Sequence, residues 1–265
     1  RHGHEVRVAQ LVAMELDQPV HALAESRGRA VIFLDQDDLW HPLTLARELS
    51  VLEAEVSRVA AVCPYHHWRP VAGGYPEPAS IWGEARPIAL DPEFTGWVYH
   101  QFLFDCWALT SGTLLRREAV VAAGGFDENL PFSEDWDLWL RLSRQGTFAL
   151  LEWPVVLYRH HEVQGSRQVR DRDWRTELLL RNAAEHGLAS RDGRAMAPGR
   201  FQELIARYEA DFGYHHLQFG DRRRGAQVML AAWRRRRAAP GPVRWPCRWR
   251  PGTAWNARAP RRRLW

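Results

Sequence analysis

Two short apolar segments with an amphipathic stretch between them constrain the fold more than any other feature of this chain. Residues 30–34 and 59–63 are apolar throughout and have the length of buried strands. Between them, four apolar residues recur at spacings of three or four, which predicts a helix with one apolar face. These residues are Leu45, Leu49, Leu52 and Val56. Strand, helix and strand in this order predict a βαβ unit within an α/β sheet.

The first apolar segment ends in a turn that carries three carboxylates, those of Asp35, Asp37 and Asp38. Open α/β sheets bind ligands at the carboxyl ends of their strands, which is where this turn lies. Three negative charges so close together repel one another unless solvent, a proton or a cation relieves the repulsion. A hard divalent ion, Mg²⁺ or Mn²⁺, would relieve it directly. The alternative is a solvated turn in which Asp38 caps the following helix.

Three known acidic motifs can be compared with this turn. An EF-hand loop counted from Asp35 needs glycine and glutamate where the chain has Trp40 and Ala46, so that motif is excluded. A phosphatase of the haloacid dehalogenase type also begins with a strand and D-x-D. It usually needs a phosphate-binding lysine, and this chain contains no lysine. The third is the D-x-D motif of nucleotide-sugar glycosyltransferases, whose carboxylates hold a metal ion that bridges the donor diphosphate.

A second acidic turn, at Glu134 and Asp135, follows the first by about a hundred residues. It opens a predicted helix that runs to about Gln145, with Ser133 as the N-cap and Gly146 as the stop. The helix dipole favours acids in a first turn by about 0.3–1 kcal/mol, which is a structural reason for both residues. It does not explain why two acidic turns occur at this separation.

The rest of the chain divides into an α/β part and a helical part. Residues 64–105 are rich in proline, glycine and aromatic residues and predict an irregular surface region. From about Arg172 the periodicity is helical only, and after Ala239 no periodicity remains, which predicts disorder. The further predicted segments are a helix over 116–123, an extended stretch over 147–158, a helix over 174–185 and a helix hairpin over 201–233.

Charge is distributed unevenly along the chain. Fourteen arginines and no acid lie between Arg222 and Trp265, which leaves 22 basic and 32 acidic residues before them. The acidic body predicts no nucleic-acid partner. The interleaved Arg and Trp of residues 244–250 could contact an anionic membrane surface or RNA, although a solvated tail is the simpler interpretation. Three scattered cysteines form no C-x-x-C pair, and we expect a cytoplasmic protein, with a peripheral contact at the inner face of the membrane.

Five blocks in a fixed order carry a family resemblance. Together they resemble the family 2 glycosyltransferases of the GT-A fold, over roughly residues 15–167. The resemblance implies a GT-A-type (Rossmann-like) mixed sheet flanked by helices, followed by a small α-helical region. The blocks are F-L-D-Q-D-D-L-W-H-P (33–42), S-G-T-L-L-R-R-E (111–118), G-G-F-D-E (124–128), S-E-D-W-D-L-W-L-R (133–141) and Y-R-H-H (158–161).

The resemblance implies a donor site for a nucleoside-diphosphate sugar and a divalent metal ion, Mg²⁺ or Mn²⁺. Asp37 matches the metal ligand, and Asp35 would contact the metal or the donor ribose. His161 would be a third metal ligand or a contact to the diphosphate, and Arg159 would neutralise phosphate charge. Asp38 is expected to hold the turn.

The resemblance also implies the acceptor half of the site. Asp135 matches the general base that takes the proton of the acceptor hydroxyl, and Glu134 would orient the acceptor or the loop. Trp107, Ser111 and Gly112 would line the acceptor side, although a buried aromatic is the commoner explanation for Trp107. The implied reaction is a single displacement with inversion at the anomeric carbon. The acceptor would be a saccharide, a lipid-linked sugar or a protein, in cell-surface polysaccharide, glycolipid or glycan synthesis.

The chain departs from the family pattern at its beginning. The usual first strand, base-binding loop and V-D-D-G-S-type turn have no match, so we expect a sheet that is incomplete at the N-terminus and a truncated catalytic domain. A non-catalytic glycosyltransferase-like protein that recruits partners through its helix hairpin is the alternative to an enzyme. The expected division is a GT-A catalytic domain over 1–170, a helical region over 171–239 and an Arg/Trp-rich tail over 240–265.

Overall fold

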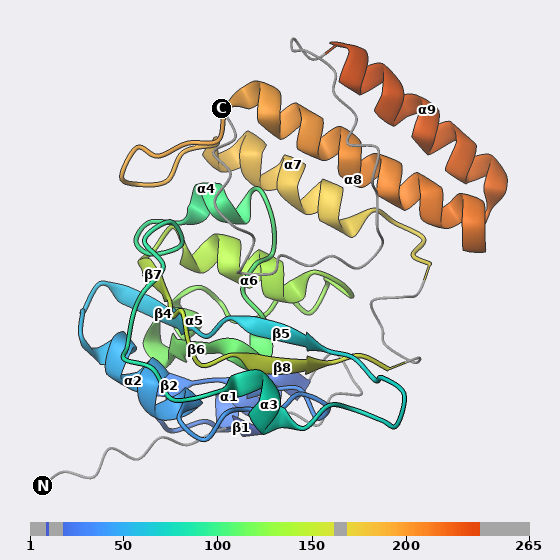
Figure 1. Ribbon diagram of the computed structural model, residues 1–265. Helices are drawn as coiled ribbons and strands as arrows, with labels where there is room; N and C mark the ends of the chain where they lie inside the picture. The colour runs from blue at the N-terminus through green and yellow to red at the C-terminus, as the bar shows by residue number, and fades with distance from the viewer. Residues whose placement is uncertain (1–8, 11–17, 162–168, 239–265) are drawn as a thin grey trace, which may run out of the picture.

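The computed structural model describes residues 9–10, 18–161 and 169–238 (Figure 1). The predicted tail at 240–265, with Cys247, lies outside the described residues, as do the first eight residues. The described strands are β1 (Ala9–Gln10), β2 (Ala30–Val31), β3 (Phe33–Leu34), β4 (Arg58–Val62), β5 (Tyr65–Trp68), β6 (Thr113–Arg116), β7 (Thr147–Leu150) and β8 (Val156–Arg159). The described helices are α1 (Gln18–Glu25), α2 (Thr44–Glu53), α3 (Pro78–Trp82), α4 (Tyr99–Phe102), the 3₁₀ turn η1 (Thr110–Gly112), α5 (Arg117–Ala122), α6 (Glu134–Leu142), α7 (Trp174–His186), α8 (Pro198–Phe219) and α9 (Arg222–Ala238).

The central sheet is mixed, with the strand order β2-β6-β4-β7. β6 runs antiparallel to both of its neighbours, β2 and β4, and β7 runs parallel to β4. The predicted strand–helix–strand unit is therefore present as β2, α2 and β4, with β6 inserted between the two strands. The predicted strand at 30–34 is divided, because β2 pairs with β6 whereas β3 pairs with β1. The expected α/β class, with helices on a mixed sheet, is confirmed.

The core lies on both faces of this sheet, because successive side chains of a strand point to opposite sides. Ala60 and Val62 of β4 belong to the apolar cluster that also contains residues of α6, α7 and α8. Ala61 and Cys63 belong to the second cluster, which α2 completes. Figure 1 shows α2 on one side of the strands and α6, α7 and α8 on the other. Val56 was expected on the apolar face of α2, but it lies past the end of that helix and is 90% exposed.

The prediction of an irregular surface region over residues 64–105 was wrong in two respects. β5 lies there and pairs in parallel with β8, and this two-stranded ribbon is built from aromatic, histidine and arginine side chains as well as aliphatic ones. α4 also lies there, and its Tyr99 and Phe102 are buried in the larger core cluster. The composition was typical of a loop, but these aromatic side chains supply apolar area that tertiary packing buries.

The C-terminal helices were predicted correctly in kind and order. α7 is the expected helix, and α8 and α9 form the expected hairpin with its turn at Gly220 and Asp221. The two helices approach closely where Gly213 faces Gly225. A Cβ on Gly225 would lie 2.7 Å from the Gly213 carbonyl, so a larger residue would not fit there. Among the described residues, no helix combines the length and the apolar character that crossing a membrane requires.

Glu48 is a buried acid on α2, and it gives the fold a pH-dependent stability. Its side chain is fully buried, and one carboxylate oxygen accepts a hydrogen bond of 3.3 Å from the backbone N–H of Cys63. Burial raises the pKa of Glu48 from 4.5 to about 8. The unfolded chain loses this proton near pH 4.5 while the folded chain keeps it to about pH 8, so stability falls as the pH rises through that window.

Glu48→Gln is therefore expected to remove this part of the pH dependence, since glutamine stays neutral. Relative to the unchanged protein, the Tm of the variant should be higher at the alkaline end of the window than at the acid end. The change in Tm caused by the substitution should be more positive at the alkaline end than at the acid end by at least about 2–4 °C, which corresponds to ~1 kcal/mol in a domain of this size. Thermal unfolding in buffers at the two ends of the window measures it. The control is Glu53→Gln on the exposed side of the same helix, and equal pH profiles for the two variants would contradict the prediction.

Candidate active site

The first acidic turn follows β3, and hydrogen bonds join it to the segment that precedes β6. The backbone N–H of Asp35 donates a hydrogen bond of 3.0 Å to the hydroxyl of Ser111, and the indole N–H of Trp40 donates to the Ser111 carbonyl. Ser111 is fully buried. Gly112 is also buried, and a Cβ on it would come within 3.0 Å of the Cys63 carbonyl. Ser111 thus supports the acidic turn, and the predicted place of both residues on the acceptor side stays a prediction.

Asp38 connects the same turn to β8. Its side chain is buried, and Oδ1 accepts a hydrogen bond of 3.1 Å from the backbone N–H of Arg159. Backbone hydrogen bonds between Leu39 and Leu157, of 3.1 and 2.9 Å, join the two segments as well. Burial raises the pKa of Asp38 to about 7. This geometry suits the expected role of Asp38 in holding the turn.

Asp37 and His161 form a pair across the turn. His161 Nε2 lies 2.8 Å from Asp37 Oδ2, and the two side chains are 39% and 27% exposed. No group of three or more His, Cys, Asp or Glu side chains that could hold a metal ion occurs within the part of the chain that the structure describes. Mg²⁺ is commonly held by one or two carboxylates together with substrate phosphates and waters. The pair fits such a shared site better than a cage made by protein ligands alone.

Arg159 is the last residue of β8, two residues before His161. Its guanidinium stacks over two aromatic rings, with its carbon 4.7 Å from the ring centre of Trp68 and 4.8 Å from that of Tyr75. Its backbone N–H is the donor to Asp38. The side chain is thus fixed against β5, two residues from His161. Its predicted contact with the donor phosphates stays a prediction.

The second acidic turn is the first turn of α6. Asp135 Oδ1 accepts a hydrogen bond of 2.6 Å from the backbone N–H of Trp136. Asp135 Oδ2 faces the hydroxyl of Thr110 at 3.4 Å and the thiol of Cys106 at 3.9 Å. Burial raises the pKa of the Cys106 thiol, with the charge of Asp135 adding to the effect, so that the thiol remains a donor to the carboxylate.

Ser133 occupies the N-cap position of α6, as predicted, but not with the expected chemistry. Its backbone is left-handed, with φ at 61°, and its side chain makes no capping hydrogen bond. Few non-glycine residues adopt this conformation, and such strain often accompanies a functional site. Here it directs the chain into α6 immediately before Glu134 and Asp135.

The two acidic turns come together although about a hundred residues separate them. Burial raises the pKa of Asp35 to about 6, and the charges of Asp37 and Asp135 contribute to the increase. Burial also raises the pKa values of Glu134 and Asp135, and the charge of Asp35 acts on Glu134. Carboxylates with perturbed pKa values are concentrated at functional sites. The fold therefore places the predicted donor-side and acceptor-side acids in one electrostatic cluster.

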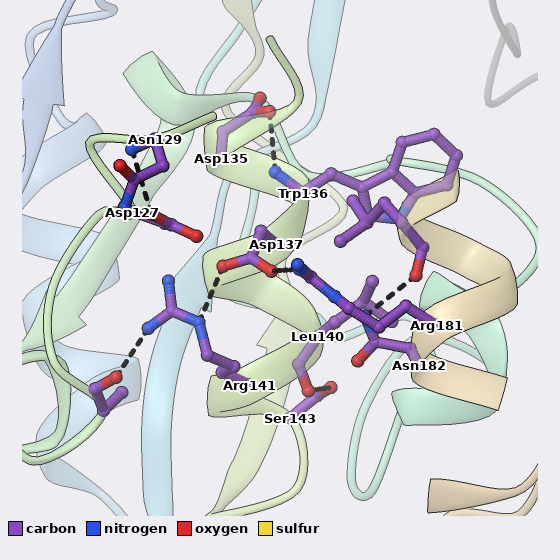
Figure 2. A network of polar contacts seen from close by, with 12 residues as sticks. Asp127, Asn129, Asp135, Trp136, Asp137, Leu140, Arg141, Ser143, Arg181 and Asn182 are labelled. Atoms are coloured by element: carbon purple, nitrogen blue, oxygen red, sulfur yellow. Dashed lines mark hydrogen bonds and ion pairs between the residues drawn. The ribbon is translucent and has the colours of Figure 1, made fainter. Parts of the chain in front are cut away.

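An ion-pair network around the buried Asp137 holds α6 in place, and only part of it is visible in the sequence. Figure 2 shows Asp137 between Arg141 and Arg181, at 2.7 Å from Arg141 Nε and 2.8 Å from an Arg181 terminal nitrogen. Arg141 also donates a hydrogen bond of 2.6 Å to the carbonyl of Ala123, just after α5. The spacing of four between Asp137 and Arg141 is visible in the sequence. The contact with Arg181 on α7 is not.

Trp107 lies in an aromatic cluster of the core. Its ring stacks on Phe102 with centroids 4.6 Å apart and also contacts Phe94 and Phe148. This arrangement agrees with the commoner explanation, a packed interior aromatic. Its predicted place on the acceptor side remains a prediction.

Sequence reasoning missed three groups near the cluster. Thr110 and Cys106 face Asp135, and neither stands out by type or spacing. On the β5–β8 ribbon, His67 Nδ1 lies 2.5 Å from His160 Nε2, between the rings of Tyr65 and Tyr158. The available signal for this strand was a pair of histidines flanked by Tyr65 and Trp68, since aromatic residues favour strands.

Comparison with known proteins gives one family and several solved structures. The family model described as glycosyltransferase-like family 2 matches residues 2–183. No curated protein matches the chain. Among solved structures, S. aureus TarS 1-349 in complex with UDP-GlcNAc is 16% identical, with 84% of this chain and 61% of that chain covered and a TM-score of 0.49.

A second solved structure is the mannosyltransferase PcManGT from Pyrobaculum calidifontis in complex with GDP-Man and Mn²⁺. It is 16% identical, with 83% of this chain and 55% of that chain covered and a TM-score of 0.42. The chain therefore spans less than two thirds of the length of either protein.

Proposed function

Since the chain belongs to the glycosyltransferase-like family 2, we propose that it moves a sugar from a nucleoside-diphosphate sugar to an acceptor hydroxyl, with inversion at the anomeric carbon. The observation that carries the proposal is the meeting of the two acidic turns on the adjacent residues Thr110 and Ser111: the Asp35 backbone N–H donates to the Ser111 hydroxyl, and the Thr110 hydroxyl donates to Asp135. One turn would serve the donor and the other the acceptor. Both reacting groups would then lie within one site.

The donor half of the proposal rests on Asp37, Asp35 and His161. Asp37 and His161 already lie 2.8 Å apart, and Asp35 lies two residues before Asp37 in the same turn. These residues would hold Mg²⁺ or Mn²⁺ together with oxygens of the donor diphosphate. When bound, the ion would supply Lewis-acid stabilisation of the charge on the leaving nucleoside diphosphate. Arg159 would add positive charge on the same side.

The acceptor half rests on Asp135. Its Oδ1 is occupied by the Trp136 backbone N–H, whereas Oδ2 makes longer contacts with Thr110 and Cys106. Oδ2 is thus the atom that would take the proton of the acceptor hydroxyl. The raised pKa strengthens the carboxylate as a base, because efficiency improves as the pKa approaches the working pH. Glu134 would orient the acceptor beside it.

The stereochemical outcome follows from a single displacement at the anomeric carbon. The acceptor oxygen would attack the anomeric carbon as Asp135 takes its proton, and the nucleoside diphosphate would leave from the opposite face. One displacement inverts the configuration. Positioning and electrostatic stabilisation would provide most of the acceleration. We propose a saccharide, a lipid-linked sugar or a protein as the acceptor, in the synthesis of cell-surface polysaccharide, glycolipid or glycan.

A panel of nucleotide sugars tests the proposal, with release of the nucleoside diphosphate measured in the presence of Mg²⁺ or Mn²⁺ and of candidate acceptors. Acceptor-dependent release from at least one donor is the expected result. Release of inorganic phosphate from simple phosphoesters, without transfer of any sugar, would point instead to a hydrolase.

Asp37→Asn should weaken the Mn²⁺-dependent binding of a nucleoside diphosphate by at least ~10–100-fold, the loss that removing even an outer partner of a metal ligand commonly causes. The reason is that asparagine replaces a charged oxygen ligand with a neutral one. Calorimetric titration with and without Mn²⁺ measures the effect. Glu84→Gln, at an exposed carboxylate elsewhere, is the matched control. Unchanged affinity in Asp37→Asn would remove this residue from the metal site.

A further inference from the structure

Helix α9 has one face packed on α8 and another that faces outward. Gly225 and Ala232 are buried against α8, with Val228 and Met229 partly buried beside them. Arg235 extends this inner face, where it pairs with Glu209 of α8 at 2.9 Å. Figure 1 shows α9 as the outermost helix, on the side of α8 away from the sheet. Its outer face is therefore remote from the acidic cluster.

The outer face combines arginines with large apolar side chains. Arg223, Gln227, Leu230 and Arg234 follow one another at spacings of three or four, so they share one side of the helix. Leu230 is 47% exposed, and the neighbouring Trp233 is 46% exposed. The sequence of α9 contains seven arginines and no acid. At the turn that leads into this helix, Phe219 is 73% exposed.

We propose that this outer face of α9 lies on an anionic lipid bilayer, with Leu230 and Trp233 inserted among the headgroups and the arginines on the lipid phosphates. The arginines of this face match the negative charge of such a bilayer, and its apolar side chains match the apolar region below the headgroups. Helices that lie in the plane of an interface combine a basic polar surface with leucine, phenylalanine or tryptophan, and the exposed part of α9 supplies both kinds of side chain. Tryptophan is enriched at the headgroup level because its ring is apolar and its N–H is polar.

A nucleic-acid strand fits this face less well. Phosphates of a nucleic acid would also pair with the arginines, but a strand offers no apolar phase for Leu230. The residues before Arg222 carry an excess of acid, 32 acidic against 22 basic, which would repel an extended polyanion. A bilayer touches only the outermost helix and leaves the acidic body away from its surface. The inference concerns a surface distinct from the acidic cluster and does not depend on the proposed reaction.

The test is co-sedimentation of the full chain with vesicles. One set contains phosphatidylcholine alone, and in the other phosphatidylglycerol replaces part of it. We expect binding to the anionic vesicles only, and its loss at ~1 M salt, where the Debye length falls to about 3 Å. Arg223→Gln/Arg234→Gln should weaken the partition about 30-fold, since each arginine near such a surface contributes about 1 kcal/mol. Leu230→Gln/Trp233→Gln should weaken it as well, because the inserted apolar area is lost.

Matched controls separate this surface from net charge and from misfolding. Arg27→Gln/Arg86→Gln removes two exposed arginines elsewhere and should leave vesicle binding within about twofold, because charges beyond a Debye length of the surface are screened. Residues 239–265 are present in every sample, so differences between variants report on α9. Glutamine is a good helix former, and circular dichroism should be unchanged.

Two results would overturn the proposal. One is equal binding of the unchanged protein and Arg223→Gln/Arg234→Gln to anionic vesicles. The other is tighter binding to polyuridylate than to those vesicles, unaffected by Leu230→Gln/Trp233→Gln, which would assign the face to nucleic acid instead.

Discussion

Asp135→Asn is expected to slow sugar transfer by about 10²–10⁴-fold, the usual contribution of a general base, while leaving donor binding nearly unchanged. Asparagine keeps an oxygen that can accept from the Trp136 backbone N–H, so the first turn of α6 should stay folded. It cannot take a proton from the acceptor hydroxyl. The loss should therefore fall on turnover, with little effect on the dissociation constant of the donor.

Initial rates of nucleoside diphosphate release with a saturating acceptor, together with calorimetric donor binding, measure the two quantities. Glu128→Gln is a suitable control because it removes an exposed carboxylate a short distance before α6. It should leave both quantities near those of the unchanged protein. Near-normal turnover in Asp135→Asn would exclude this residue as the base.

Asp137→Ala is expected to destabilise the protein by about 3–5 kcal/mol, the typical cost of removing one partner of a buried ion pair. The Asp137 side chain is only 5% exposed and serves two arginines (Figure 2). Without it, the guanidinium of Arg141, itself 22% exposed, keeps its charge but loses its carboxylate. The network joins α6 to α5 and α7, so the loss should affect the whole fold.

Urea denaturation followed by circular dichroism measures this change. Arg181→Gln provides the comparison, because the Arg181 side chain is 52% exposed and water can replace part of its interaction. We expect ~1 kcal/mol or less for that variant, as for other exposed ion pairs. Equal losses in Asp137→Ala and Arg181→Gln would mean that the contact with Arg141 contributes little.

The sequence predicted those elements whose signal is local. The apolar runs at 30–34 and 59–63 became strands, and the periodicity over 174–185 and 201–233 became helices, because each pattern depends on neighbouring residues alone. The insertion of β6 between β2 and β4 was not predictable in this way. Strand order depends on contacts between residues far apart in sequence, and the residue types of β6 do not indicate that it pairs with β2 and β4.

For the candidate site, the sequence supplied the acids but not their supports. Both acidic turns were visible as clusters of charge, and their order along the chain carried the family resemblance. The hydrogen bonds of Ser111 to Asp35 and of Thr110 to Asp135 could not be predicted, because serine and threonine are common in turns and their presence there does not indicate a partner. The family resemblance implied that Asp37 and His161 serve the same donor site, and the folded chain adds their direct contact across 124 residues.

The pairing of β2 with β6, and of β5 with β8, has a consequence for synthesis on the ribosome. Val31 finds its partner only at Leu115, and Tyr65 only at Val156. At translation rates of ~5–20 residues per second, about 6–25 s separate the emergence of Asp37 from that of Arg159. Throughout that delay the nascent acidic turn has none of its later neighbours from β8 onward, and the candidate site is complete only when β8 and His161 have been made.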